Sequence, residues 1–460
     1  MEKQHIRDFA GRHVHFVGIG GISMSGLAEI LLEKGYTVSG SDLKLSGLTA
    51  RLQANGATIY QGHHSQNISG ADLVVYTAAV KDDNPELMEA GRQGIPCMDR
   101  ATLLGQIMET FRFAIGVAGS HGKTTTTSML AMMMHRAGLD PTILVGGELD
   151  EIGGNVRTGQ SEFFITEACE YMDSFLKFRP YLAIILNIDS DHLDYFKDLG
   201  QIYSSFVKYA GLVPESGYVV GCGDDPLVLK LMGEVNCRTI TYGIDHPCNW
   251  TAENISYDSN GRSSFSLINN GKDLGRFSLK VPGKHNVYNA LASIAACSLM
   301  GVSPEKMQEA LLHYKGTHRR FELKGRTDRQ ATIIDDYAHH PAEVKATIST
   351  ALNYPHNRLW CIFQPHTYTR TQKLFREFTE AFHGVDFLIL TDIYAAREKN
   401  TGDINSGMLA EAISEKGVNC SYISDFGEIT AYVRQHAKPG DLVITMGAGD
   451  IYKVGEALLK

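Results

Sequence analysis

The feature that most constrains this fold is a glycine turn between an apolar strand and an apolar helix. Residues 113–127 read FAIGVAGSHGKTTTT, and a strand that turns directly into a helix belongs to a parallel α/β sheet. The N–H groups of such a turn surround phosphates, Lys123 adds positive charge, and the Thr124 hydroxyl suits Mg²⁺. Val117 replaces the usual first glycine. We expect a nucleoside triphosphate to bind at Gly119, Ser120, His121, Gly122, Lys123, Thr124 and Thr125.

A second glycine turn, without a lysine, lies near the N-terminus. It follows the β-rich run 13–17, and Ser23 stands where a dinucleotide fingerprint has its third glycine. Asp42 ends the next strand, where an acid that binds ribose belongs. Two different phosphate loops indicate two phosphorylated ligands, although a dinucleotide site and a purely structural turn remain open alternatives. The residues that we expect to bind the second ligand are Gly18, Gly20, Gly21, Ser23 and Asp42.

Strands and helices alternate along the whole chain, which predicts three α/β units with parallel sheets. We place a Rossmann-like unit at 1–111, a P-loop unit at 112–318 and a second Rossmann-like unit at 319–460. The stretch 236–282 is polar and β-rich with Asn/Gly turns, so we expect it to add β-hairpins to the mostly parallel P-loop sheet.

Charge, hydropathy and cysteine spacing exclude several classes of protein. The net charge is −9 and no stretch is basic, which argues against nucleic acid as a partner. No apolar run reaches the ~18 residues that cross a bilayer, and no signal peptide precedes the first strand, so we expect no membrane insertion. The eight cysteines form no C-x-x-C pair, which is typical of a reducing compartment. We therefore expect a cytoplasmic protein.

Carboxylates and an imidazole follow strands of the P-loop unit. Glu167 and the run 189–194, which contains Asp191 and His192, should lie at the sheet edge beside the phosphates. Glu167 and His192 are candidate Mg²⁺ ligands. The alternative for Asp191 is a helix N-cap before a predicted helix at 193–206.

Two asparagines begin a later helix. His285 and Asn289 are four residues apart and share one face, and an asparagine amide at 286 or 289 could contact adenine, with helix capping as the simpler alternative.

The third unit carries polar clusters after its strands. These contain Tyr337 and His339 before a helix that starts near Pro341, then Arg370, then Arg397. With two arginines at 319–320, they predict a cationic mouth that attracts carboxylates and phosphates, although each residue alone could be a solvated loop residue.

Taken together, the ordered motifs resemble the Mur ligase family over the whole chain. The turn 18–21 together with Tyr337-Ala-His-His-Pro341 points to the alanine-adding member of that family. The segments that carry the resemblance are 15–26, 119–125, 167–170, 187–194, 285–286, 318–322, 336–341 and 364–366.

The resemblance implies a reaction. The first domain would hold UDP-N-acetylmuramate, the second ATP and Mg²⁺, and the third would close over the site and bring L-alanine. The muramate carboxylate would be phosphorylated by ATP, and the alanine amine would displace phosphate from the acyl phosphate. This would be an amide-forming ligation in peptidoglycan precursor synthesis, by a monomer or homodimer.

The resemblance also implies roles for particular residues. Thr124, Glu167 and His192 would hold Mg²⁺, while Asn286, Asn289 and Arg319 would bind ATP. The catalytic set would be Lys123, Glu167, His192, His339 and Arg370, and the substrates would also meet His192, Arg320, Tyr337, His339 and Arg370. One departure is Cys169, which lies where many relatives have a more acidic run. No lysine can be matched to the carbamylated lysine of sibling ligases.

Four alternatives remain open at this point. A related ligase attaches a recycled tripeptide to the same nucleotide sugar and shares most motifs. A folylpolyglutamate synthetase-like ligase would not need the first glycine turn. An NAD(P)-dependent oxidoreductase would leave Gly-Lys-Thr without a role. A nucleotide-gated binding protein would not need Glu167 and His192 together.

Overall fold

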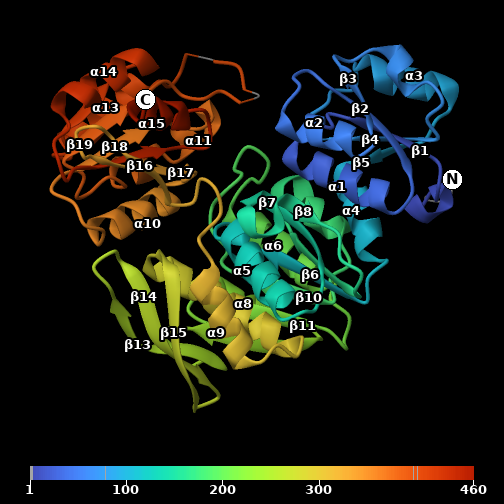
Figure 1. Ribbon diagram of the computed structural model, residues 1–460, viewed down its shortest axis with the longest axis horizontal. Helices are drawn as coiled ribbons and strands as arrows, with labels where there is room; N and C mark the ends of the chain where they lie inside the picture. Colours follow the sequence, from blue (N-terminus) through green and yellow to red (C-terminus); the bar gives the residue numbers. More distant parts are fainter. Residues whose placement is uncertain (1–3, 78, 397, 401) are drawn as a thin grey trace.

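The computed structural model describes residues 4–77, 79–396, 398–400 and 402–460, so Arg397 lies outside the described residues. Three sheets of five, ten and six strands lie within 13–99, 113–282 and 322–446. This confirms the α/β class with three successive units, while the domain limits after residues 111 and 318 stay predictions. Figure 1 shows the first unit (blue) and the third (orange to red) on opposite sides of the view, with the middle unit between and below them.

The first unit is a parallel five-stranded sheet in the order β3-β2-β1-β4-β5. The order reverses between β1 and β4, which places a ligand crevice at the carboxyl ends of these two strands, next to the end of β2. Its strands are β1 (His13–Val17), β2 (Thr37–Asp42), β3 (Thr58–Gln61), β4 (Leu73–Tyr76) and β5 (Cys97–Asp99). Its helices are η1 (Ile6–Phe9), α1 (Ile22–Glu33), α2 (Gly47–Ala54), η2 (Ser65–Ile68), α3 (Pro85–Gln93) and α4 (Arg100–Met108).

The middle unit has a ten-stranded sheet in the order β15-β14-β13-β12-β11-β10-β6-β9-β7-β8. Its centre is parallel, and the predicted hairpins β13–β15 extend one edge with turns at 258–261 and 269–271. Its strands are β6 (Phe113–Ala118), β7 (Thr142–Leu149), β8 (Gly154–Arg157), β9 (Phe163–Glu167), β10 (Leu182–Ile185), β11 (Tyr218–Cys222), β12 (Arg238–Gly243), β13 (Trp250–Tyr257), β14 (Arg262–Asn269) and β15 (Lys272–Pro282). Its helices are α5 (Lys123–Arg136), η3 (Asp150–Ile152), η4 (Tyr171–Lys177), α6 (Leu199–Ala210), α7 (Pro226–Met232), α8 (Lys284–Leu299) and α9 (Pro304–His313).

The third unit is a six-stranded sheet in the order β16-β17-β21-β18-β19-β20, in which the edge strand β16 alone is antiparallel. Its strands are β16 (Glu322–Arg326), β17 (Thr332–Asp336), β18 (Leu359–Phe363), β19 (Phe387–Leu390), β20 (Cys420–Tyr422) and β21 (Leu442–Met446). Its helices are α10 (Pro341–Leu352), α11 (Tyr368–Lys373), α12 (Phe375–Thr379), α13 (Ser406–Glu415), α14 (Phe426–His436) and α15 (Tyr452–Leu458).

Alternate side chains of the central strands enter different hydrophobic clusters. In β6, Ala114 and Ala118 join one cluster while Ile115 and Val117 join another. The same alternation separates Trp360 in β18 from its neighbours. Because successive side chains of a strand point to opposite faces, each sheet is covered on both sides and its ligand sites are confined to strand ends.

Two local predictions were wrong between β10 and α6. The strand ends at Ile185 instead of 188, and the helix begins at Leu199 instead of 193. Asp198 is the N-cap, because its Oδ1 accepts the N–H of Gln201 at 2.9 Å. Residues 186–198 are therefore free to form the loop that carries Asp191 and His192.

No helix among the described residues is both long enough and apolar enough to cross a membrane.

Candidate active site

The P-loop lysine is held by its own loop and by a buried glutamate. Gly122 is the N-cap of α5, and its φ of 85° lies in the left-handed region that favours glycine. Lys123 Nζ donates to the carbonyls of Gly119 and Ser120, and to Glu170 Oε2 at 3.0 Å and Oε1 at 3.2 Å. Burial is the largest single effect and lowers the pKa of Lys123, but the Glu170 carboxylate and neighbouring acidic groups such as Asp191 together raise it above its usual value. Lys123 is therefore charged and paired at neutral pH.

Oxygen ligands for a divalent cation lie beside the P-loop. Thr124 is almost fully buried, and its methyl group lies 3.2 Å from the position that a Cβ on Gly147 would take. Glu167 ends β9, and its Oε1 accepts the N–H of the neighbouring Gly146 at 2.6 Å. Thr124 and Glu167 thus each lie against one of two adjacent glycines of β7, and a hydroxyl and a carboxylate are oxygen donors that Mg²⁺ accepts.

A chain of charged side chains runs from Glu170 to the third unit. His192 Nε2 lies 3.9 Å from Glu170 Oε1 and 3.8 Å from Asp191 Oδ2. The Arg370 guanidinium donates to Asp191 Oδ1 at 2.8 Å, and both side chains are largely buried. His192 has a φ of 52°, uncommon for a residue other than glycine and often found at functional sites. Asp191 is therefore not a helix cap but the partner of a cation from the third unit.

His339 presents a neutral ring to this chain. Burial lowers its pKa to about 4, so the ring is uncharged at neutral pH and only one of its two nitrogens carries a proton. Its Nδ1 lies 3.0 Å from the carbonyl oxygen of Tyr337, which fixes the N–H on Nδ1 and leaves Nε2 as an acceptor. The ring of His366 lies 5.4 Å away, and Arg370 Nη1 approaches His366 Nδ1 at 3.2 Å.

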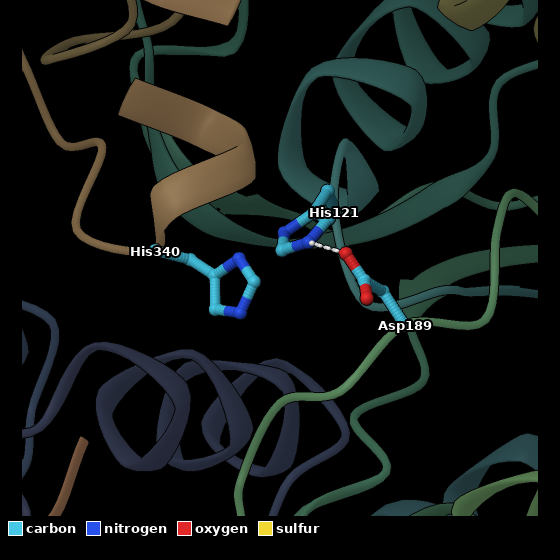
Figure 2. Close-up of side chains that lie close together, drawn as sticks. All are labelled: His121, Asp189 and His340. Carbon is cyan, nitrogen blue, oxygen red and sulfur yellow. Dashed lines mark hydrogen bonds and ion pairs between the residues drawn. The ribbon is translucent and has the colours of Figure 1, made fainter. Parts of the chain in front are cut away.

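His121, Asp189 and His340 meet between the P-loop and the third unit (Figure 2). His121 Nε2 lies 3.3 Å from Asp189 Oδ2, and its Nδ1 lies 3.3 Å from Glu343 Oε1. The ring centroids of His121 and His340 are 4.7 Å apart. Burial lowers the pKa of His121, but hydrogen bonds to Asp189 and Glu343 raise it to about 9.

A cavity of about 640 Å³ lies between the P-loop unit and the third unit, a size that suits a nucleotide. Asn286 and Asn289 of α8 line it and neither caps a helix, because the N-cap of α8 is Gly283. The third unit contributes Arg320, Asp336 and Glu343 to its wall, and the middle unit also contributes His121, Asp224 and Tyr288.

The expectation that Arg319 binds nucleotide stays a prediction, and the position of Arg319 differs from that of Arg320. Among the described residues that line the cavity, Arg320 is present and Arg319 is not. The Arg319 guanidinium lies between the rings of Tyr337 and Tyr452, and its Nε donates to Asp335 at 3.0 Å. These contacts already satisfy its charge, so Arg320 is the better candidate.

The N-terminal glycine turn is a second candidate site, apart from the P-loop. The turn leads into α1, whose N-cap is Gly21, so Gly18 and Ser23 lie beside a helix N-terminus. Asp42 Oδ2 accepts the N–H of Gly20 at 2.9 Å, and a Cβ on Gly20 would lie 2.9 Å from the same oxygen. The turn and the acid are therefore fitted to one another.

Sequence reasoning missed the roles of Glu170 and Glu343. Glu170 follows Glu167 by three residues, but nothing in the sequence indicates that it pairs with Lys123. Glu343 follows the helix N-cap His340 by three residues, which is the capping-box spacing and was a readable signal. Its contact with His121 is visible only in the folded chain.

Three family models match the chain in succession. One described as the Mur ligase family, catalytic domain, matches residues 13–112, and one described as the Mur ligase middle domain matches 117–297. One described as Mur ligase, glutamate ligase domain, matches 319–449. The chain is 56% identical to a UDP-N-acetylmuramate–L-alanine ligase from Acetivibrio thermocellus, over 98% of this chain and 96% of that protein.

Two solved structures resemble the whole chain. The UDP-N-acetylmuramate–alanine ligase from Thermotoga maritima has a TM-score of 0.83 and 30% identity, covering 97% of this chain and 98% of its own. A murein peptide ligase from Psychrobacter arcticus has a TM-score of 0.73 and 27% identity, with the same coverage of both chains.

Proposed function

The chain belongs to the Mur ligase family, and from that premise we propose that it joins L-alanine to the carboxylate of UDP-N-acetylmuramate in an ATP-dependent ligation. Members of this family are ATP-dependent amide-forming ligases, so the chain is an enzyme of that class. The observation that carries the proposal is the series of charged contacts from Lys123 of the P-loop, through Glu170, His192 and Asp191, to Arg370 of the third unit. A cavity lined by the same two units and a second glycine turn on the first unit complete the arrangement. Each of the three reactants then has a unit suited to it.

Residues of three units would bind the reactants. The turn at Gly20 and Asp42 would hold the diphosphate and ribose of the UDP-sugar. The P-loop and Lys123 would hold the ATP phosphates, while Asn286, Asn289 and Arg320 would surround the adenosine. Closure of the third unit excludes water from the reacting groups, which protects an acyl phosphate from hydrolysis.

Thr124, Glu167 and His192 would hold Mg²⁺. The hydroxyl and carboxylate oxygens fit this ion, and His192 lies on the side facing the third unit. When bound, Mg²⁺ neutralises charge on the phosphates.

The reaction would proceed in two displacements. A muramate carboxylate oxygen attacks the γ-phosphorus, the bond to the ADP oxygen breaks, and an acyl phosphate forms. The alanine nitrogen then attacks the acyl carbon, phosphate leaves, and the nitrogen loses a proton. Arg370, placed by Asp191, would orient substrate oxygens, and the free Nε2 of His339 would accept a hydrogen bond from the amine.

Phosphate release from Mg-ATP tests this function. We expect release only when UDP-N-acetylmuramate and L-alanine are both present, with the amide product identified by mass. Release that requires L-alanyl-γ-D-glutamyl-meso-diaminopimelate in place of L-alanine would identify a peptide-recycling ligase. If phosphate is not released with either amine, both proposals are contradicted. Oxidation of a nicotinamide cofactor would then be the next assay.

We further propose that the enzyme acts in the cytoplasm, as a monomer or homodimer. All eight cysteines are free thiols, which suits a reducing compartment that also supplies ATP.

A further inference from the structure

The cluster of His121, Asp189 and His340 has the donor atoms of a transition-metal site. One ligand atom from each side chain lies within 4.8 Å of the other two. His121 Nε2 and Asp189 Oδ2 are 3.3 Å apart, while a tetrahedral ion with ligands at about 2.1 Å holds them about 3.4 Å apart. Modest side-chain adjustment would therefore bring all three atoms into one coordination shell.

The outer nitrogen of each histidine is already held as it would be in a metal site. His340 Nε2 lies 3.0 Å from the carbonyl oxygen of Ser190, while its Nδ1 accepts the N–H of Ala342 at 3.3 Å. This fixes the N–H on Nε2, and an ion bound at Nδ1 would take the place of the long hydrogen bond from Ala342. For His121, Glu343 Oε1 at 3.3 Å is the acceptor for the Nδ1–H when Nε2 binds an ion. Histidine ligands typically donate their second N–H to a carboxylate or a backbone carbonyl in this way.

The ligands come from two units of the fold. His121 belongs to the P-loop and Asp189 to the loop after β10, whereas His340 is the N-cap of α10 in the third unit. Figure 2 shows the His340 ring opposite His121, on the side away from Asp189. An ion at this point would tie the third unit to the P-loop beside the cavity that His121 lines.

We propose that His121 Nε2, His340 Nδ1 and Asp189 form a site for a borderline divalent ion such as Zn²⁺ or Co²⁺. Two imidazoles and one carboxylate favour these ions over Mg²⁺, which prefers oxygen donors. The site is separate from the Mg²⁺ ligands Thr124, Glu167 and His192, and it does not depend on the ligase activity. Its occupation would hold the third unit closed on the P-loop and slow the exchange of nucleotide.

Co²⁺ titration of the full-length protein, in excess Mg²⁺, tests the site through visible absorption, with Zn²⁺ as competitor. We expect one Co²⁺ with imidazole and carboxylate ligands. His340→Asn keeps an acceptor at the helix N-cap but removes a ligand, and Asp189→Asn changes a half-exposed side chain. Each should weaken binding at least about tenfold. His313→Asn, an exposed position in α9, should leave it unchanged.

A second cluster sets the outcome that would overturn the proposal. Cys169, Glu170 and His192 also place ligand atoms within 4.8 Å of one another. Binding of Co²⁺ there would give a near-ultraviolet thiolate band that Cys169→Ser removes. If that band carries the whole signal, or if the Asp189 and His340 variants bind Co²⁺ like the unchanged protein, the assignment is wrong. If His340→Asn does not fold, the Asp189 variant decides the question alone.

Discussion

Replacing Glu170 by glutamine should make nucleotide binding depend less on Mg²⁺. The Lys123 ammonium lies 3.0 Å from Glu170 Oε2, and their side chains are 14% and 2% exposed. At this distance and an effective dielectric constant of about 20, the two charges attract by about 5 kcal/mol. The lysine charge is thus neutralised before any phosphate arrives, and Asp191 adds negative charge nearby. Metal-free ATP should therefore bind poorly to the unchanged protein.

In Glu170→Gln, the γ-phosphate can take the place of the carboxylate beside Lys123. Removal of one partner of a buried ion pair typically costs about 3–5 kcal/mol, so the free protein should be less stable. Binding of ATP without Mg²⁺ gives Lys123 a negatively charged partner again. If binding recovers about 2 kcal/mol of the lost stability, ATP binds roughly thirtyfold more tightly. The ratio of the two dissociation constants, for ATP in EDTA and for Mg-ATP, should fall by about that factor.

Isothermal titration with both forms of ATP measures this ratio. The matched control is Glu29→Gln, which breaks a comparable partly buried pair with Arg51 in the first unit. The control should change stability but not the ratio. Equal weakening of both forms of ATP by Glu170→Gln would show that Glu170 only supports the fold, and the electrostatic reasoning would be refuted.

Three other changes probe the metal ligands, the first unit and its acid stability. Gly146→Ala would place a Cβ 2.8 Å from Glu167 Oε1, so the Mg²⁺ concentration for half-maximal ligase rate should rise about tenfold. Asp42→Asn removes a carboxylate that accepts the N–H of Gly20 at 2.9 Å, so UDP-sugar binding should weaken by about 1.5 kcal/mol in titration calorimetry. Glu86 is fully buried, and although burial raises its pKa, hydrogen bonds from three side chains lower it to about 2. Because the folded pKa is depressed, about 3 kcal/mol of stability should be present above about pH 4.5 and lost as the pH falls towards 2, and Glu86→Gln should flatten this dependence in urea unfolding.

Each of these predictions has its own control. Gly91→Ala adds a Cβ in open space, so its Mg²⁺ dependence should match that of the unchanged protein. The Asp42 variant should keep its affinity for Mg-ATP, and a parallel loss would mean that the whole chain is disturbed. Parallel stability curves for the unchanged protein and the Glu86 variant between about pH 2 and 5 would rule out the assigned role of Glu86.

Local sequence patterns were enough to predict the architecture. Alternation of strands and helices, two glycine turns and Asn/Gly hairpin turns depend on neighbours along the chain, and each appears in the structure. Boundaries were less reliable. The loop at 186–198 was predicted as strand and helix because its apolar residues continue both patterns, and Asp198, not Asp191, proved to be the cap.

The site shows the same division. From the sequence, Lys123, Glu167, His192 and Arg370 were selected by residue type at strand ends, and the fold brings Lys123, His192 and Arg370 into one chain of contacts. The sequence could not tell whether Arg319 or Arg320 faces the cavity. The two residues are adjacent and chemically identical, so they differ only in the direction that the backbone gives each side chain. The structure directs Arg319 to Asp335 and Arg320 to the cavity.

The sequence by itself thus determined the fold class, the two phosphate loops and the family, because these depend on short-range spacing and residue chemistry. The tertiary structure alone decided that Glu170 pairs with Lys123, that Arg370 pairs with Asp191, and that His340 faces His121. These pairs are separated by between 47 and 219 residues. The first pair depends on which strands of the middle sheet become neighbours, and the other two depend on how the middle and third units pack, and no local pattern encodes either arrangement.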